Sequence, residues 1–174
     1  NQLPTVLDTP EETLILPEQE TFASHSLSNR PIEERGLDLD ECRKKVEVDI
    51  KEKRANSITL DGLVDSEKAS IIKTENSDSR NVLLSAVYHK NADFLQYLFG
   101  ILPVLGLTQL IAESIDTEHN SILHLAISVE CQEILDMVWR ELCSKFDEHR
   151  ISSLLVDTNT DNMNAYALLI RQHK

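Results

Sequence analysis

The sequence predicts an all-α protein in which short helical hairpins stack side by side, preceded by an acidic linker without stable structure. Three observations predict this. Apolar residues of the second half recur at steps of three and four, the spacing of one helix face. The same pattern returns after 40 residues. Four of the five prolines lie in the first 31 residues, and only one of the eight aromatic residues precedes Tyr88, so the two halves differ in composition.

Length and composition exclude several classes of protein. A chain of 174 residues holds one modest domain and a tail, which rules out a multidomain enzyme. A net charge of -13 repels phosphate backbones, so we expect no direct nucleic-acid binding by this segment. Three cysteines are too few for a disulfide framework, and their odd number favours a reducing compartment. No apolar stretch approaches the roughly 20 residues that span a bilayer, so we expect no membrane partner.

Residues 1–78 are predicted to be a mostly disordered acidic linker. Early prolines, dense charge and scarce aromatic residues leave too little apolar surface to offset a chain entropy of about 1–2 kcal/mol per residue. Within the linker, residues 38–55 have apolar side chains at helical spacing, which predicts a transient or docked helix. The residues of this spacing are Leu39, Cys42, Val46 and Ile50, and a weaker spacing follows at Leu60, Leu63, Val64, Ile71 and Ile72.

Six basic residues of this region admit two interpretations. They are Arg43, Lys44, Lys45, Lys51, Lys53 and Arg54. Alone they would resemble a divided nuclear-import signal. Acidic residues lie between them, however, at Glu47, Asp49 and Glu52. We therefore favour a solvated helix face with ion pairs between residues four apart.

From residue 79 the chain is predicted to form repeated helical hairpins, at 79–118, at 119–161 and in a truncated third copy at 162–174. Residues 81–88 (NVLLSAVY) align without a gap with residues 121–128 (SILHLAIS), and a third copy opens at Asn164. The residues expected to hold the repeats together are Leu83, Ala86, Leu123, His124, Ala126 and Leu135. A second helix should begin near Ala92 and near Gln132. Since neither hairpin can bury its apolar face alone, stacking of hairpins is the favoured fold, with an unrelated two-helix hairpin as the alternative.

These residues resemble ankyrin repeats. The family pattern Thr-Pro-Leu-His-x-Ala-Ala, followed by a helix that ends in an apolar run, is similar to residues 121–127 and 133–139. The resemblance implies a helical-hairpin solenoid of two to three irregular repeats. The usual turn glycine is replaced by Ser79, His119 and Asn162. Of these only asparagine tolerates a left-handed backbone well, so we expect irregular loops in place of tight turns.

Residues 107–116 (LTQLIAESID) before 120–127 (NSILHLAI) resemble the opening repeats of IκB proteins and of NF-κB precursors, including the Relish type. That resemblance implies an inhibitory, protein-binding ankyrin region in innate immune signalling. Its partner would be a Rel homology domain or the basic nuclear-import segment of one, in the cytoplasm or shuttling to the nucleus. The alternative is a general ankyrin scaffold or adaptor, or the cytoplasmic repeats of a membrane protein, without a Rel partner.

Acidic residues at or near the expected turn tips are the candidate partner-binding residues, because an acidic face prefers a basic partner. They are Asp116, Glu118, Asp157 and Asp161.

Two motifs in the linker are candidate processing sites. Residues 65–70 (DSEKAS) resemble the IκB phosphodegron, with Ser66 and Ser70 for a kinase and a ubiquitin ligase to act on, although Glu67 replaces the glycine of the family motif. Residues 58–61 (ITLD) before Gly62 resemble an initiator-caspase site, with Asp61 preceding the cleaved bond in an extended, exposed context. Both patterns are short enough to arise by chance.

We assign no catalytic, cofactor-binding or metal-binding residues and predict that the chain is not an enzyme. It has no glycine-rich phosphate loop, no nucleophile elbow and no zinc-protease helix motif. Cys131 lies seven residues after His124, a spacing that packing explains more simply than a catalytic dyad. His119, His124 and Cys131 lack the paired short spacings of a structural zinc site.

Overall fold

The computed structural model describes residues 38–172, and within this range the secondary structure is helical, with a single isolated antiparallel bridge between Ile115 and Ser121. The helices are α2 (Leu39–Lys51), α3 (Ile58–Asp61), α4 (Asp65–Lys73), α5 (Val82–Tyr88), α6 (Ala92–Ile101), α7 (Leu110–Glu113), α8 (Ile122–Ser128), α9 (Gln132–Lys145), α10 (Glu148–Val156) and α11 (Ala165–Gln172). The prediction of an all-helical chain is confirmed for this part of the molecule.

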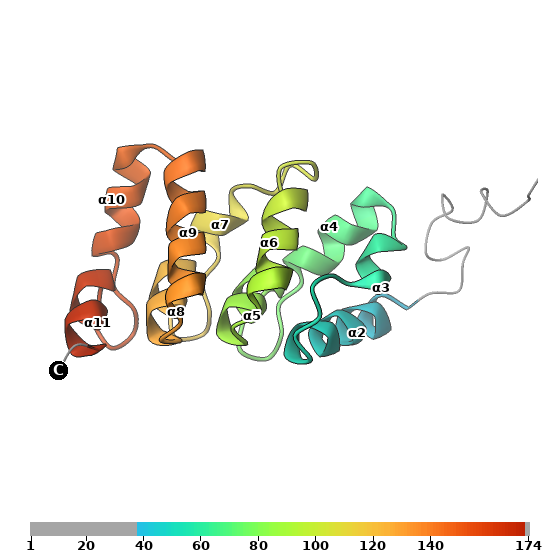
Figure 1. Cartoon of the computed structure of the whole chain (residues 1–174), viewed down its shortest axis with the longest axis horizontal. Helices are drawn as coiled ribbons and strands as arrows, with labels where there is room; N and C mark the ends of the chain where they lie inside the picture. Colours follow the sequence, from blue (N-terminus) through green and yellow to red (C-terminus); the bar gives the residue numbers. More distant parts are fainter. Residues whose placement is uncertain (1–37, 173–174) are drawn as a thin grey trace, which may run out of the picture.

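The helices stack as pairs along one axis. Helices α2, α5, α8 and α11 follow one another along one edge, and α4, α6, α9 and α10 lie along the other (Figure 1). Helix α5 pairs with α6 and touches α2 on one side and α8 on the other, while α8 pairs with α9 and touches α11. Each pair thereby covers the apolar face of its neighbour.

The first helix of each pair is buried because it has neighbours on several sides. Six of the seven residues of α5 are buried, and so are six of the seven residues of α8. Ala86 and Ala126 are inaccessible to solvent, as expected where short side chains let helices approach closely. Of the residues expected to hold the repeats together, Leu83, Ala86, Leu123, His124 and Ala126 are buried and Leu135 is half-buried.

Residues 38–73 do not form a disordered linker. Helix α2 lies inside the predicted range 38–55, but α3 and α4 follow it, and Val46, Ile50 and Ile72 belong to the same hydrophobic core as α5. The prediction failed because the apolar residues of α3 and α4 look too sparse to fold alone, whereas in the structure they pack against a neighbouring pair. The part of the predicted linker at 1–37, and residues 173–174 of the third repeat, lie outside the described residues.

A left-handed residue follows the first helix of three successive pairs. Lys53, Lys90 and Glu130 have φ of 57°, 53° and 52°, and each closes the end of α2, α5 or α8. The amides of Lys53, Lys90 and Glu130 donate to carbonyls of the preceding helical turn, at 3.0–3.1 Å. In addition, the Asn91 side chain donates to the carbonyls of Ile50 and Arg54, joining the second pair to the first. The N-terminal helices are therefore a further unit of the same kind.

Three of the four basic residues of α2 are paired with acidic residues four positions away. Arg43 and Lys51 lie 2.6 and 4.0 Å from Glu47, and Lys45 lies 2.7 Å from Glu41. Arg43 is itself buried and donates to the carbonyl of Thr74. This arrangement favours the ion-paired helix face over the nuclear-import signal.

Candidate protein-interaction surface

Three turns, one before each of α5, α8 and α11, share one hydrogen-bond pattern. In each, the side chain of the first residue accepts bonds from the amides two and four positions later, at 2.9–3.1 Å. The first and fifth residues are joined by their backbones, at 3.0–3.1 Å. The turns are residues 76–80, 116–120 and 159–163, beginning at Asn76, Asp116 and Asn159. Asparagine and aspartate stabilise turns in this way because their short side chains mimic a backbone acceptor.

The expectation of irregular loops was therefore wrong. Ser79, His119 and Asn162 have φ of 54°, 58° and 55°, so the fourth residue of every turn is left-handed although none is glycine. The side-chain and backbone bonds of the turn hold this conformation against the strain that a side chain adds there.

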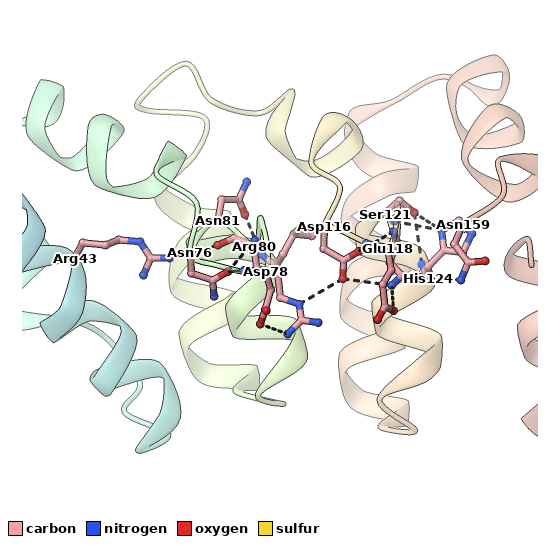
Figure 2. Close-up of polar contacts among 12 residues, drawn as sticks. Arg43, Asn76, Asp78, Arg80, Asn81, Asp116, Glu118, Ser121, His124 and Asn159 are labelled. Carbon is pink, nitrogen blue, oxygen red and sulfur yellow. Dashed lines mark hydrogen bonds and ion pairs between the residues drawn. The ribbon is translucent and has the colours of Figure 1, made fainter. Parts of the chain in front are cut away.

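Successive turns are bonded to each other. The Thr117 amide donates to the carbonyl of Asp78 at 3.0 Å, and the Thr160 amide donates to the carbonyl of Glu118 at 2.9 Å. Side chains add to this ladder, since Asn159 donates to the side-chain carbonyl of Asn120 at 2.9 Å. Figure 2 shows the resulting series of polar contacts, which runs from Arg80 through Asp116 and on to Asn159. The three turns thus form one continuous edge of the molecule.

Asp116 belongs to the interior of this edge and not to its surface. Its side chain accepts from the amides of Glu118 and Asn120, and its second oxygen lies 3.4 Å from Nε of Arg80. Asp116 is only 2 % exposed. We therefore correct its assignment: it cannot contact a partner, because its carboxylate is used to build the turn.

The exposed carboxylates of the turns occupy one equivalent position. Asp78, Glu118 and Asp161 are each the third residue of a turn, and all three are exposed. Since the ladder joins neighbouring turns, these residues follow one another along the edge, and we call them the tip row. Two of them were predicted from the sequence. Asp78 was missed because its turn was assigned to the linker, and Asp157, also exposed, lies before the third turn and outside the row.

His124 is a structural residue that connects two units. Its Nδ1 accepts from the Ser121 amide at 3.3 Å and lies 2.8 Å from the Ser121 hydroxyl. Its Nε2 lies 3.1 Å from the carbonyl of Met163, in the next turn, so the neutral ring donates there. Burial lowers the pKa of His124, because desolvation penalises the charged ring more than the backbone acceptors of Met163 and Asp157 and the nearby acidic side chains favour it.

A groove with a volume of about 470 Å³ runs beside the first turn, between α2 and α5. Its floor includes Arg80, whose guanidinium lies 3.8 Å from the centre of the Tyr88 ring. The charged residues that line it are Asp40, Arg43, Lys44, Glu47, Lys51, Glu75, Asp78 and Arg80. Acidic and basic groups are equal in number, so this groove favours neither sign of charge.

The candidate caspase site lies in folded structure. Asp61 is the last residue of α3 and Gly62 is its C-cap. The Asp61 carboxylate accepts a bond of 2.6 Å from the Tyr97 hydroxyl of α6, and burial together with this bond raises the pKa of Tyr97. The expected extended context is therefore absent, because α3 is held by the neighbouring pair.

The candidate phosphodegron lies on α4. Ser66 and Ser70 are exposed, whereas Glu67 between them is buried. Glu67 accepts from the Val64 amide at 3.1 Å and so closes the start of the helix. Glu67, the residue that departs from the family motif, thus stabilises the start of the helix. Modification of Ser66 and Ser70 stays a prediction.

Residues 38–172 contain no group of three or more histidine, cysteine or acidic side chains placed to hold a metal ion. No helix in this range has the length and apolar character to cross a membrane. The three thiols, of Cys42, Cys131 and Cys143, are free.

Comparisons with protein-family models, with curated proteins and with solved structures gave no match.

Proposed function

We propose that residues 38–172 are an ankyrin-type array that binds a protein partner through the tip row. The observation that carries the proposal is the turn pattern, repeated three times and bonded from turn to turn. Such an edge presents side chains at fixed intervals, which suits recognition of another protein more than it suits a reaction.

The charge of the tip row indicates the partner. Asp78, Glu118 and Asp161 add three exposed carboxylates to a chain of net charge -13. A basic segment would be attracted at long range and held by several exposed ion pairs, each contributing about 0.2–1 kcal/mol. This preference agrees with the resemblance to IκB proteins and NF-κB precursors.

On this basis the chain is the inhibitory region of a Rel-type transcription factor precursor in innate immune signalling. It would mask the basic import segment of a Rel homology domain in the cytoplasm, and its removal by cleavage or degradation would release that domain. The folded position of Asp61 adds a condition, since cleavage there requires α3 to detach first.

The test is binding of the chain to a Rel homology domain that includes its basic import segment, measured by calorimetry at low and at physiological salt. We expect binding that weakens with salt. The variant Asp78→Asn, Glu118→Gln and Asp161→Asn should bind about tenfold more weakly, a loss of about 1.4 kcal/mol.

A matched variant controls for net charge. Asp93→Asn, Glu133→Gln and Asp136→Asn remove the same charge from exposed positions on α6 and α9. The proposal requires near-normal binding from this variant. Equal losses from both variants would reject the tip row as the site. If the folded chain binds no Rel domain, the alternative function of a general ankyrin scaffold remains, because such a scaffold needs neither a Rel partner nor a processing site.

A further inference from the structure

The charged residues of the groove beside the first turn differ in depth. Three of them form its floor, with side chains that are only 10–14 % exposed: Arg43, Glu47 and Arg80. The others form its rim and are exposed: Asp40, Lys44, Lys51, Glu75 and Asp78. The floor therefore holds two cations and one carboxylate, whereas the rim holds two cations and three carboxylates. The groove is balanced as a whole, but its floor is positive and its rim is negative.

The one carboxylate of the floor is already paired. Glu47 lies 2.6 Å from Nη1 of Arg43, and Lys51 and the His89 ring approach it within 4.0 Å. Arg43 also donates to the carbonyls of Thr74 and Arg80, so it reaches from α2 to the first turn (Figure 2). Neither member of this pair has much capacity left for a ligand.

Arg80 keeps a donor that no described residue uses. Its Nε and Nη1 lie 3.4 and 3.3 Å from the carboxylates of Asp116 and Asp78, and its guanidinium lies over the Tyr88 ring. Within residues 38–172, its Nη2 donates to no acceptor. The unused hydrogen-bonding capacity of this cation is therefore suited to an anion.

The hydroxyl of Ser85 is a second unused group at this groove. Ser85 lines the groove and is 1 % exposed, and its Oγ has no hydrogen-bond partner among the described residues. A buried hydroxyl of this kind is costly unless another group bonds to it. The equivalent residue of α8, 40 positions later, is Leu125, which is 4 % exposed. A short polar side chain thus stands at the groove where the next unit has a longer apolar one.

We propose that this groove binds a segment of a partner protein in which one glutamate or aspartate is flanked by basic residues. The acidic side chain would reach the floor, where the Ser85 hydroxyl and Nη2 of Arg80 donate to its carboxylate. The basic residues on either side would meet the exposed carboxylates of Asp40 and Glu75 at the rim.

Charge complementarity selects this occupant. A wholly acidic segment would be repelled by a chain of net charge -13. A wholly basic segment would leave the donors of the floor without an acceptor. A basic segment with one carboxylate satisfies both levels of the groove. The site shares Asp78 with the tip row but needs neither Glu118 nor Asp161, and the proposal does not depend on a Rel partner.

The test compares two synthetic peptides on the full chain. One is acetyl-Ala-Lys-Lys-Glu-Lys-Lys-Ala-amide, and the other carries Gln in place of Glu. Titrations followed by NMR give both affinities, and we expect the Glu peptide to bind about tenfold more tightly, because its carboxylate accepts charge-assisted bonds. It should shift the amides of Ser85, Tyr88 and His89. General attraction to the acidic chain predicts the reverse order, since the Gln peptide has one more positive charge.

Variants of the full chain locate the bound carboxylate. Ser85→Leu introduces the residue that the next unit has at this position, so the chain should stay folded while the preference for the Glu peptide is lost. Ser85→Ala removes only the hydroxyl, and the preference should fall about threefold. Ser128→Leu is the matched control, because it makes the same change at an exposed residue of α8 that does not line the groove. It should leave the preference unchanged.

The groove and the tip row can fail independently. A chain with Glu118→Gln and Asp161→Asn should keep the preference for the Glu peptide, whatever its affinity for a Rel domain. Four results would overturn the proposal. They are the absence of any amide shift at millimolar peptide, equal or tighter binding of the Gln peptide, a preference that survives both changes of Ser85, and amide shifts confined to Glu118 and Asp161.

Discussion

Asp116 shows how one carboxylate can serve the fold although its position in the sequence suggests recognition. It accepts two amide bonds and lies beside Arg80, all in the interior of the turn edge. Asp161, at the tip of the next turn, is exposed. The sequence could not separate the two roles, because both residues are acidic, lie near a turn and have polar neighbours. The geometry of the left-handed turn directs the Asp116 side chain inward and the Asp161 side chain outward.

We predict that Asp116→Ala lowers the free energy of unfolding by about 2–4 kcal/mol, because it leaves buried donors without their acceptor. Asp161→Ala should change it by less than about 0.5 kcal/mol. Urea unfolding at neutral pH measures both. Similar losses from the two variants would show that Asp116 is not the structural carboxylate described above.

His124 makes folding depend on pH. Burial lowers the pKa of His124 and also that of His89, so near pH 6.5 the unfolded chain binds more protons than the folded chain. Stability should therefore fall as the pH drops from 7.5 through 6.5 towards the lowered pKa values. Urea unfolding at several pH values measures the slope, and His124→Gln should reduce it. An unchanged slope in this variant would argue against a buried neutral ring.

At the scale of the elements, the turns explain what the sequence did and did not predict. The first helices were predicted because apolar residues mark their buried faces at 81–88 and 121–128. The tight turns were not predicted, because the sequence carries serine and histidine at positions where the backbone must be left-handed. The signal that was overlooked is the asparagine or aspartate three positions earlier, which supplies the acceptor that holds the turn.

Glycine at the strained positions should stabilise the chain. We predict that Ser79→Gly and His119→Gly each raise the free energy of unfolding by about 0.5–1 kcal/mol, since relief of left-handed strain outweighs the added chain entropy. Asn162→Gly should gain less, because asparagine tolerates this conformation. Thermal unfolding compares the three with Thr117→Gly, which is not left-handed and should lose stability. Destabilisation by His119→Gly would contradict the turn geometry.

Of the N-terminal helices, α2 was predicted within residues 38–55, whereas α3 and α4 were assigned to a disordered linker. The apolar residues of α3 and α4 are few, and α2 and α4 both pack against α5, a helix of the neighbouring pair. Local periodicity therefore could not reveal that α3 and α4 belong to the folded part of the chain.

We predict that Ile50→Ala lowers the free energy of unfolding of the whole chain by about 2–4 kcal/mol, because Ile50 is fully buried. Val48→Ala, on the same helix but 45 % exposed, is the matched control and should cost far less. Chemical denaturation followed by circular dichroism measures both. If Ile50→Ala left the free energy of unfolding unchanged, residues 38–73 would not be part of the folded core.

At the scale of the whole molecule, stability and the proposed recognition surface both come from one repeated unit. Each helix pair buries its face on the next, and each turn is bonded to the one before it, so the tip row is a product of stacking. The 40-residue offset predicted the stacking, because it returns the same apolar positions. It could not predict the ladder, which depends on how neighbouring units meet.

Amide hydrogen exchange at Thr117 and Thr160 tests the stacked edge most directly. Each amide donates to a carbonyl of the preceding turn and takes no part in a helical hydrogen bond. Read by NMR on the full chain, both amides should exchange far more slowly than in an unstructured peptide, with comparable protection. Exchange of both at the unprotected rate, in a chain whose helices stay protected, would show that the turns do not join and that no continuous binding edge exists.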